Sequence, residues 1–410
     1  MDLHSAYPFW MIKEGILGSF PKLHDCTKAE VVVVGAGITG ALIAHRLCEA
    51  GIDVVVLEKR HVAHGSTSAS TAMLQYEIDI PLFDLSQKIG KKKAVRAYRI
   101  CSDAIDEIGR ISKPFGDQAD FQKLPSLYYA SYAHHDRDII QPEFKARKSA
   151  GFEVSLLSES DIRKEYGFSA ASAIRSAQGG HVNPYKLCHH LLADAQKKGA
   201  RIYDSIEITR IEQNGDEVQL WSGEGLEIKA RHVIVACGYE SQRYLPVPVT
   251  LFNASYAIVS TPLDEKHVWK DNALVWETKT PYLYMRTTAD RRIIVGGRDE
   301  RTADPARRDS LLPFKKLQLE NDFRRLFPGI PFDTDFAWAG VFGETEDGLP
   351  YIGSYDQDRI HYAMNYGGNG ITFSVAAAHI LTDAVRGKKN ADAALFSFDR
   401  LKKVRKPGGW

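Results

Sequence analysis

Residues 31–59, VVVVGAGITGALIAHRLCEAGIDVVVLEK, contain the pattern that decides the fold. The stretch begins with four valines, as expected of a short parallel strand that is covered on both faces. Gly35, Gly37 and Gly40 then have the G-x-G-x-x-G spacing. The first glycine permits a tight turn, the second lets the backbone approach a pyrophosphate, and the third lets a helix pack on the strand. The apolar positions that follow predict a crossover helix over residues 38–50, which Gly51 ends.

A second apolar strand, residues 54–57, ends at Glu58. An acid at this place can accept hydrogen bonds from the ribose hydroxyls of an adenosine. A glycine motif alone is weak evidence, but a strand, glycines, a helix, a strand and a terminal acid in this order predict a site for ADP. NAD and FAD both contain this half, so the stretch does not choose between them.

Composition excludes several classes of protein. The chain has 410 residues, of which 44% are hydrophobic and 26% charged, so we expect a large core and two domains. Lys and Arg number 53 against 52 Asp and Glu, which argues against a nucleic-acid partner. No segment has the ~20 apolar residues that span a bilayer, and the N-terminus lacks a signal-peptide pattern. The five scattered cysteines form no CxxC pair, which predicts no metal site and a cytoplasmic protein.

The segments after residue 60 favour FAD over NAD. An NAD enzyme would usually continue directly into further β-α units. Here a run of small and hydroxyl residues, 61–72, can lie along a pyrophosphate and a second ring, before a helix expected over residues 74–88. The next strand of the sheet, residues 232–236, comes only after a ribbon of residues 201–211 and 218–228, for which Asn-Gly-Asp predicts the turn.

A second glycine-rich turn lies near the end of the chain. Residues 359–364 predict a strand, and residues 367–370, GGNG, lead into an apolar helix over residues 371–386 that Gly387 ends. The N-terminus of this helix offers free N–H groups and a positive dipole end. Aimed at the pyrimidine edge of a flavin, these groups would stabilise the negative charge that builds there on reduction. An ordinary helix cap is the alternative explanation.

Together these segments resemble the family of FAD-dependent oxidoreductases that includes D-amino acid oxidase, glycine oxidase and sarcosine oxidase. The similarity covers nearly the whole chain and rests on VVVVGAGITGALIAHRL with Glu58, GSTSASTAML, GGHVNPYKLCHHLLADAQKKGARI, VIVACGYES, YLYMRTTADRRIIVGGRDE, WAGVFGETEDGLPYIG and NYGGNGITFS. The resemblance implies an α/β fold (α+β overall), with a Rossmann-like FAD-binding domain and a substrate domain built on a large antiparallel sheet that roofs the flavin.

The resemblance also implies a discontinuous FAD-binding domain. We expect this domain to contain residues 1–88, 150–245 and 345–410, and the substrate-binding domain to contain residues 89–149 and 246–344. Asn183 and Pro184 predict the N-cap and first turn of a helix that covers the cofactor sheet. Strand-like runs at 255–261, 282–286 and 292–296 suit the antiparallel roof.

The expected FAD contacts follow the matched motifs. They are Gly35, Gly37, Ile38, Thr39, Gly40, Glu58, Lys59, Ser66, Thr67, Ser68, Ser70, Thr71, Ala72, Met73, Ile208, Cys237, Gly238, Gly343, Gly367, Gly368, Asn369, Gly370, Ile371 and Thr372. The cysteine to which sarcosine oxidase-like members attach the flavin falls at Gly340, and the histidine used by the dimethylglycine dehydrogenase type falls at Ala69. Since both side chains are absent, we expect noncovalent FAD.

The resemblance implies that hydride leaves a carbon next to an amine nitrogen and reaches flavin N5, and that water then hydrolyses the imine. The flavin performs the hard step, so the protein mainly positions the substrate and excludes water. No Ser-His-Asp set is needed, and none is present. The pairs His134–His135 and His189–His190 lack an acidic third ligand at useful spacing, and we expect no bound metal.

This chain departs from the amino acid oxidases at two positions. The arginine that clamps the substrate carboxylate in those enzymes matches Phe342 here, and the arginine of the glycine oxidase C-terminal loop matches Gly368. An α-amino acid substrate is therefore in doubt, unless Arg286 or Arg298 supplies the charge. Structural roles for these two arginines are the alternative.

The substrate pocket is expected to contain Gln75, Tyr76, Tyr284, Trp338 and Phe342. Asp299 or Glu344 could steer a cationic amine into it, whereas core packing is the alternative role of the aromatic residues. The substrate is expected to be an amine or an amino acid, with oxygen or another compound as electron acceptor.

Two other functions remain open. Glycerol-3-phosphate dehydrogenases share this fold and a similar hydroxyl-rich loop, so an alcohol or hydroxy acid dehydrogenase is the second hypothesis. A non-catalytic protein that binds flavin or NAD is the third.

Overall fold

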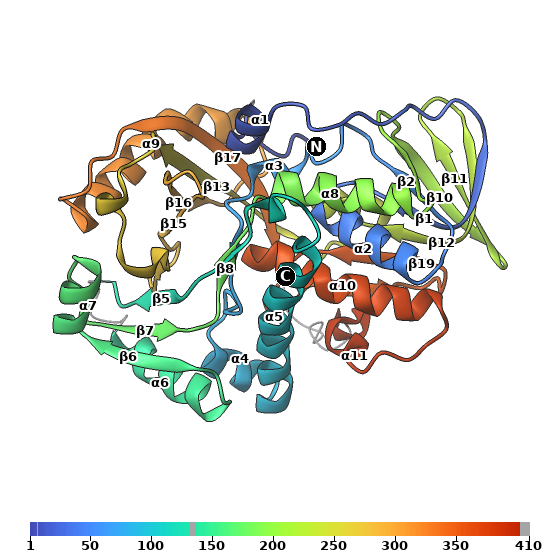
Figure 1. Ribbon diagram of the computed structural model, residues 1–410. Coiled ribbons are helices and arrows are strands. Elements are labelled where there is room, and N and C mark those ends of the chain that lie inside the picture. The colour runs from blue at the N-terminus through green and yellow to red at the C-terminus, as the bar shows by residue number, and fades with distance from the viewer. Residues whose placement is uncertain (6, 132–136, 402–410) are drawn as a thin grey trace.

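The computed structural model describes residues 1–5, 7–131 and 137–401. Two eight-stranded sheets form its two halves (Figure 1), and a three-stranded sheet with the strand order β3-β8-β4 lies between them. The helices are α1 (Phe9–Glu14), α2 (Ile38–Glu49), α3 (Ser66–Ala69), α4 (Leu82–Ile89), α5 (Lys91–Ser112), α6 (Arg137–Ser149), α7 (Glu159–Tyr166), α8 (Pro184–Lys197), α9 (Pro305–Leu326), α10 (Gly370–Val385) and α11 (Ala393–Phe396).

The first sheet has the order β10-β11-β12-β1-β2-β9, with β19 beside β12 and β18 beside β19. Its strands are β1 (Thr27–Val34), β2 (Val54–Leu57), β9 (Arg201–Tyr203), β10 (Ile208–Asn214), β11 (Glu217–Ser222), β12 (Glu227–Val235), β18 (Tyr351–Ser354) and β19 (Ile360–Met364). β1 runs parallel to both β2 and β12, and Val31 lies opposite Val54 and His232. The predicted strand, helix and strand around the glycine turn are thus present.

Both faces of β1 are buried, which explains its unbroken run of valines. Val31 and Val33 pack on the side of α2, α8 and α10, whereas Val32 and Val34 pack on the side of the β10–β11 ribbon. The four side chains are at most 5% exposed. Asn183 caps α8 as predicted, because its side chain accepts a hydrogen bond from the N–H of Lys186.

The predicted ribbon is wrong at its outer ends. Residues 201–203 form β9, which pairs in parallel with β2 at the edge of the sheet, and only β10 and β11 form the hairpin. The chain leaves the sheet between β9 and β10. Ser205 has a positive φ of 56° there, which interrupts the strand conformation. Residues 218–228 are likewise divided between β11 and the start of β12.

The helix predicted over residues 74–88 is also shorter than expected. β3 (Met73–Leu74) is followed by an irregular stretch with bends, and α4 begins only at Leu82, after Pro81. The side-chain amide of Asn369 donates hydrogen bonds to the carbonyl oxygens of Gln75 and Glu77, at 3.0 and 2.9 Å. These two bonds tie the stretch to the turn before α10.

The second sheet has the order β17-β13-β16-β15-β14-β5-β7-β6. Its strands are β5 (Ser126–Tyr129), β6 (Val154–Ser158), β7 (Ser172–Ser176), β13 (Leu251–Ser260), β14 (Leu274–Glu277), β15 (Tyr284–Thr287), β16 (Ile293–Glu300) and β17 (Thr334–Glu344); β4 (Gln122–Lys123) and β8 (Gly180–His181) belong to the small sheet. All neighbours are antiparallel except β5 and β14. α9 covers the outer face, where Leu319 and Phe323 pack with Tyr256 and Ile258.

The sheet topology differs from the predicted domain boundary at residue 150. β6 and β7 belong to the second sheet, since β7 pairs with β5, whereas the prediction places residues 150–245 in the FAD-binding domain. Nothing in the local sequence of these short strands shows which sheet they join, because their partners are distant in the chain. The rest of the proposed division stays a prediction.

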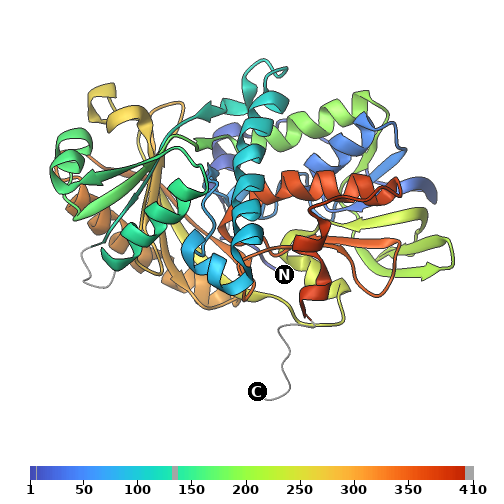
Figure 2. The ribbon, with the colours of Figure 1, turned by 90° about the horizontal axis from the view of Figure 1, so that it is seen from below.

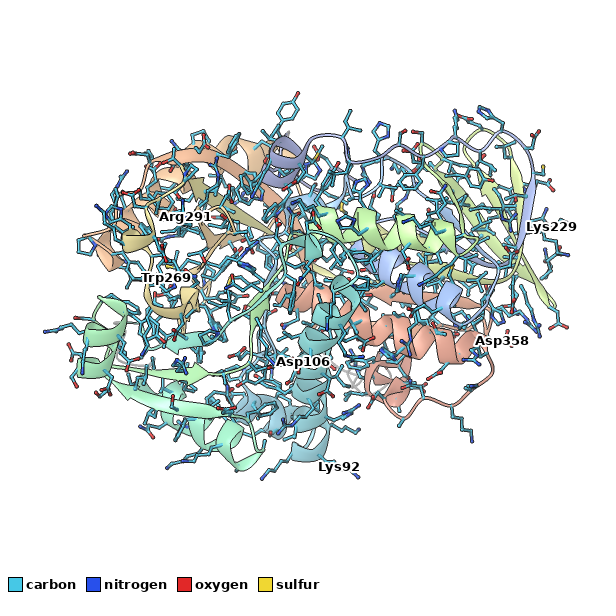
Figure 3. All side chains as sticks on the ribbon, in the orientation of Figure 1. Lys92, Asp106, Lys229, Trp269, Arg291 and Asp358 are labelled. Carbon is cyan, nitrogen blue, oxygen red and sulfur yellow. The ribbon has the colours of Figure 1, made fainter. Side chains whose placement is uncertain are left out.

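α5 lies between the two halves when the molecule is seen from below (Figure 2). Charged side chains are spread over the surface: Lys92 on α5 and Lys229 on β12 both point outward at separate places (Figure 3). Within the described ranges, none of the helices has the length and apolar character of a membrane span.

Candidate active site

One cavity runs from the carboxyl ends of β1, β2 and β12 to the inner face of the second sheet. Residues of the glycine turn, the loop of residues 65–73 and the start of α10 lie on its wall, and Ser255, Tyr282, Tyr284, Asp299, Trp338 and Phe342 close its far end. The cavity thus joins the predicted dinucleotide site to the predicted substrate site.

The glycine turn is shaped by close backbone contacts. A Cβ atom at Gly35, whose φ is 109°, would lie 2.5 Å from the carbonyl oxygen of Ala236. A Cβ atom at Gly40 would lie 1.9 Å from the carbonyl oxygen of Gly35. Gly35 and Gly37 lie on the cavity wall, whereas Gly40 lies behind it, where α2 touches the turn. The turn therefore brings backbone and the positive end of α2 to the cavity.

Glu58 lies on the cavity wall at the end of β2. One carboxylate oxygen accepts a hydrogen bond from the N–H of Ala36 at 2.7 Å, and the other accepts one from the N–H of Arg60 at 2.9 Å. Burial raises the pKa of Glu58, although these two N–H groups oppose the effect. Each oxygen keeps a lone pair, so Glu58 can still accept from the hydroxyls of a ribose.

Three side chains hold the loop of residues 65–73 from behind. The indole nitrogens of Trp338 and Trp10 donate to the carbonyl oxygens of Ala69 and Ser70, at 2.8 and 2.7 Å. Arg286 donates from Nε to the carbonyl oxygen of Thr71 at 2.6 Å. Three successive carbonyl groups are thus fixed, so the loop is held in one conformation beside the cavity.

Most hydroxyl residues of this loop lie at the cavity, and one forms a hydrogen bond within the loop. Ser66, Thr67, Ser70 and Thr71 lie on the cavity wall with Ala72 and Met73, whereas the Ser68 hydroxyl donates to the carbonyl oxygen of Gly65 and does not reach it. Ser66 Oγ is buried and has no hydrogen-bond partner within the described part of the chain. Such a group is free to form a hydrogen bond with a bound molecule.

The start of α10 also lies at the cavity. Gly367, Gly368, Gly370 and Ile371 lie on its wall. Two predicted neighbours do not: the Asn369 amide donates to the irregular stretch before α4, and the Thr372 hydroxyl donates to the carbonyl oxygen of Asn369.

Asp79 occupies the space beside this turn. Its carboxylate accepts from the N–H of Gly368 and from the Tyr282 hydroxyl, both at 2.9 Å. A Cβ atom at Gly368 would lie 2.8 Å from the Asp79 carboxylate. The place where the resemblance implies an arginine therefore holds a carboxylate and a tyrosine.

The predicted residues Lys59, Ile38, Thr39, Ile208, Cys237 and Gly238 lie on the cavity wall as well. Gly343 does not, because its Cα packs against Thr250 and the Tyr239 ring, 2.6 and 2.9 Å from an added Cβ. In the predicted substrate pocket, Gln75, Tyr284, Trp338 and Phe342 lie on the wall.

Tyr76, which is predicted for the substrate pocket, does not lie on the described cavity wall. Its ring is fully buried and stacks on Phe152, and its hydroxyl bonds the Ser176 hydroxyl at 2.9 Å. The adjacent Gln75 lies on the cavity wall, whereas the Tyr76 side chain packs in the core.

Neither arginine considered from the sequence reaches the cavity. Arg286 is buried and donates only to backbone carbonyl oxygens, those of Thr71, Thr287 and Val182. Arg298 pairs with Asp322 on α9. The cations on the described cavity wall, Lys59, Arg60 and Arg243, are paired with Glu207 or Glu240 near the Glu58 end.

The pocket end of the cavity is aromatic and acidic. The Tyr282 and Tyr284 rings lie 5.7 Å apart, and the Tyr284 hydroxyl lies 3.3 Å from the Ser255 hydroxyl. Burial, together with the nearby charges of Glu344 and Asp79, raises the pKa of Asp299 to about 7. Among the described residues, no group of His, Cys, Asp and Glu side chains is arranged to hold a metal ion.

Residues 30–384 match the family model described as FAD dependent oxidoreductase. The chain belongs to this family. Its relatives include the probable oxidoreductase OrdL of Haemophilus influenzae, 24% identical over 95% of this chain and 90% of that protein. Gamma-glutamylputrescine oxidoreductase of Escherichia coli is 26% identical over 95% of this chain and 90% of that protein. The crystal structure of glycine oxidase from Geobacillus kaustophilus has a TM-score of 0.74 at 21% identity, over 90% of this chain and 98% of that one.

The comparisons confirm the predicted family and fold class, and they identify FAD as the cofactor of this FAD-dependent oxidoreductase. The cavity fits that cofactor, because the backbone of Gly35 and Gly37 and an unpartnered serine hydroxyl lie at its wall. His134 and His135 lie outside the described residues, and His189 is buried beside Phe20 and Tyr185.

Several residues at the site escaped the sequence analysis. Leu3 lies on the cavity wall and Trp10 holds the loop, although the N-terminal segment matches no motif. Ser255, Tyr282 and Asp79 also reach the site. Their approach depends on strand pairing across the second sheet, for which a single sequence carries no local signal.

Proposed function

We propose that this protein oxidises a C–N bond of an amine, with FAD as hydride acceptor and hydrolysis of the resulting imine by water. The observation that carries the proposal is the aromatic, arginine-free pocket at the far end of the FAD cavity. FAD supplies the oxidising power, and the residues of the chain bind and orient the amine and exclude water. The names of the relatives, gamma-glutamylputrescine oxidoreductase and glycine oxidase, both describe enzymes for compounds that contain an amino group.

The residues proposed to hold FAD follow from the cavity wall. Glu58 would accept from the adenosine ribose, and the glycine turn with the start of α2 would bind the pyrophosphate. Ser66, Thr67, Ser70 and Thr71 offer hydroxyl and backbone groups along the middle of the cavity. The start of α10 offers N–H groups to the ring.

The pocket favours an amine without an adjacent carboxylate over a free α-amino acid. Phe342 and Gly368 stand where arginines would clamp such a carboxylate, and Asp79 adds negative charge beside Gly368. A carboxylate brought next to Asp79 would lack a charged partner and lose its hydration, which is costly. A hydroxy acid is disfavoured for the same reason.

Anaerobic mixing of the purified protein with a panel of compounds tests the proposal. The panel contains primary amines, N-methyl amino acids, D- and L-amino acids, and hydroxy acids, and the loss of flavin absorption is followed in time. We expect bleaching by amines, with release of ammonia or of the shorter amine. Bleaching by hydroxy acids alone, or by no compound in the panel, would contradict the proposal. Readmission of air then shows whether oxygen reoxidises the flavin.

A further inference from the structure

β16 carries a bulge beside the pocket. β16 pairs with β13 so that Tyr256 lies opposite Gly297, and the register then shifts so that Ala254 lies opposite Glu300. Two residues of β16, Arg298 and Asp299, therefore stand opposite the single residue Ser255. Gly297 and Arg298 both have a positive φ, of 138° and 59°, which is the local geometry of the bulge.

The bulge decides which charge faces the cavity. If regular pairing continued from Tyr256 and Gly297, Arg298 would lie opposite Ser255 on the cavity side, and Asp299 would lie on the side of α9. In the bulged strand, Arg298 instead reaches Asp322 on α9, and Asp299 joins Ser255 on the cavity wall. One inserted residue thus replaces a cation by a carboxylate in the pocket.

One carboxylate oxygen of Asp299 is available to bind a ligand. Its Oδ1 atom is buried and has no hydrogen-bond partner among residues 1–5, 7–131 and 137–401. The Tyr284 ring lies beside it, since Tyr284 pairs with Gly296 and its hydroxyl reaches Ser255. A Cβ atom at Gly296 would lie 2.3 Å from the Tyr284 ring, so this glycine makes room for the ring. A carboxylate next to the faces and hydroxyls of tyrosines is a suitable site for an ammonium group.

We propose that Asp299 binds the ammonium group of the substrate and accepts one proton from it. This inference rests on the proposed amine oxidation and names the residue that selects the substrate. In the proton transfer, an N–H bond of the ammonium breaks and an O–H bond forms on Asp299, leaving a neutral amine and a neutral carboxylic acid. The free lone pair of the neutral amine can then assist the departure of hydride from the adjacent carbon.

The groups that face Asp299 favour this role. Glu344 from β17 and Asp79 from the stretch before α4 repel its negative charge, whereas Ser255 from β13 and Lys315 from α9 favour it; burial is the largest effect. The net result is a pKa of about 7, far above the ordinary 3.8. A base with such a pKa is ionised in part near neutral pH and holds an accepted proton well.

The test uses the FAD-loaded protein and butylamine, at pH 5.5 to 9. A primary alkylamine stays protonated up to about pH 10, as a lysine side chain does, so a pH dependence near 7 must come from the protein. Anaerobic stopped-flow bleaching gives the apparent Kd and the limiting rate constant. The rise in melting temperature on addition of butylamine, also without oxygen, measures binding by a readout other than the bleaching rate. The variants are Asp299→Asn, Asp299→Glu and, as a matched carboxylate outside the cavity wall, Glu344→Gln.

In the wild-type protein we expect affinity and bleaching rate to rise with pH through about 7, where Asp299 ionises. Asp299→Asn is expected to lose this dependence and to bind butylamine about 10- to 100-fold more weakly, the range for a lost charge-assisted hydrogen bond. In Asp299→Glu, affinity and bleaching rate should still rise with pH. In Glu344→Gln this rise should remain but occur at lower pH, because one charge that repels the Asp299 carboxylate is removed.

Two results would be decisive against this role. The first is an Asp299→Asn variant with full FAD content that keeps the wild-type affinity and the wild-type pH dependence. This result would overturn the assignment of Asp299 and leave amine oxidation intact. The absence of bleaching by any amine would instead refute the proposed function. In that case the melting-temperature shift still measures whether Asp299 binds a cation.

Discussion

Arg298 donates two hydrogen bonds of 2.6 Å to the carboxylate of Asp322, one from Nε and one from Nη2. This bidentate pair holds the arginine of the β16 bulge against α9, with the Asp322 side chain only 9% exposed. The positive charge is thereby kept away from the cavity, and the pocket keeps the negative charge of Asp299. The contact thus links the packing of α9 to the charge of the pocket.

Asp322→Asn is expected to destabilise the protein. One of the two charge-assisted bonds is lost and Arg298 is left without a full counter-ion, which should cost about 2 kcal/mol in the free energy of unfolding. Guanidinium unfolding measures this loss. Arg325→Gln is the control, because Arg325 makes one bond of 3.3 Å to Asp322 and is 78% exposed. A similar loss in both variants would contradict the importance of the bidentate pair.

Asp299 is expected to lower stability when no cation is bound. Since its pKa rises from 3.8 to about 7 on folding, chiefly through burial, the folded state holds the proton more tightly than the unfolded chain. The contribution of Asp299 to stability should therefore fall as the pH rises from about 4 to about 7 and stay level above that range. We expect Asp299→Asn to melt at a higher temperature than wild type at pH 8, with the difference shrinking toward pH 4.

Asp290→Asn provides a control of opposite sign for that measurement. Lys13 and the Thr288 hydroxyl lower the pKa of Asp290 to about 2 against the effect of burial, so its ionised form stabilises the folded state at pH 8. The asparagine variant should melt at a lower temperature than wild type at that pH. A stabilising effect of both substitutions would show that charge is not the cause.

The sequence predicts the cofactor half of the site well and the substrate half poorly. The turn of Gly35, Gly37 and Gly40, the strands around it and the Asn183 cap depend on local pattern, and the structure contains all of them. The position of Asp299 depends on a bulge, which reverses the faces to which the following residues of β16 point. The pattern of residues 293–300 does not reveal this bulge. The sequence therefore names Asp299 and Arg298 as candidates but cannot say which of them faces the cavity.

Other errors have the same physical origin. The run of residues 201–211 has the composition of one strand, yet its break at Ser205 comes from a positive φ that a non-glycine residue adopts under tertiary constraint. Tyr76 and Gln75 are adjacent in the chain, yet Gln75 lies on the cavity wall and Tyr76 is buried in the core. Which of the two faces the cavity depends on hydrogen bonds from Asn369, which lies almost 300 residues away in the chain.

Gly40→Ala is expected to abolish FAD retention. The added Cβ atom would lie 1.9 Å from the carbonyl oxygen and 3.0 Å from the carbonyl carbon of Gly35. Because both contacts are with backbone, the start of α2 must move away from the turn that would bind the pyrophosphate. The ratio of flavin to protein absorption after gel filtration measures the effect.

Gly51→Ala is the matched control for that variant. Gly51 also borders α2, and a Cβ atom there meets nothing within 4 Å, although its φ is 76°. The left-handed backbone should cost about 1 kcal/mol in stability and leave the FAD content unchanged. If Gly40→Ala retained as much FAD as Gly51→Ala, the turn would not be a close-contact element of the cofactor site.

FAD is expected to be held without a covalent bond. Gly340 and Ala69, where related enzymes carry an attaching cysteine or histidine, face each other, since a Cβ atom at Gly340 would lie 3.2 Å from that of Ala69. Cys237 is the one cysteine on the described cavity wall; burial raises its pKa, and its thiol donates to the carbonyl oxygen of Val34 at 3.1 Å. A thiol held in this form is a poor nucleophile. Precipitation with acid should therefore release the yellow colour into the supernatant, and a yellow pellet after washing would show that an attachment site exists elsewhere on the chain.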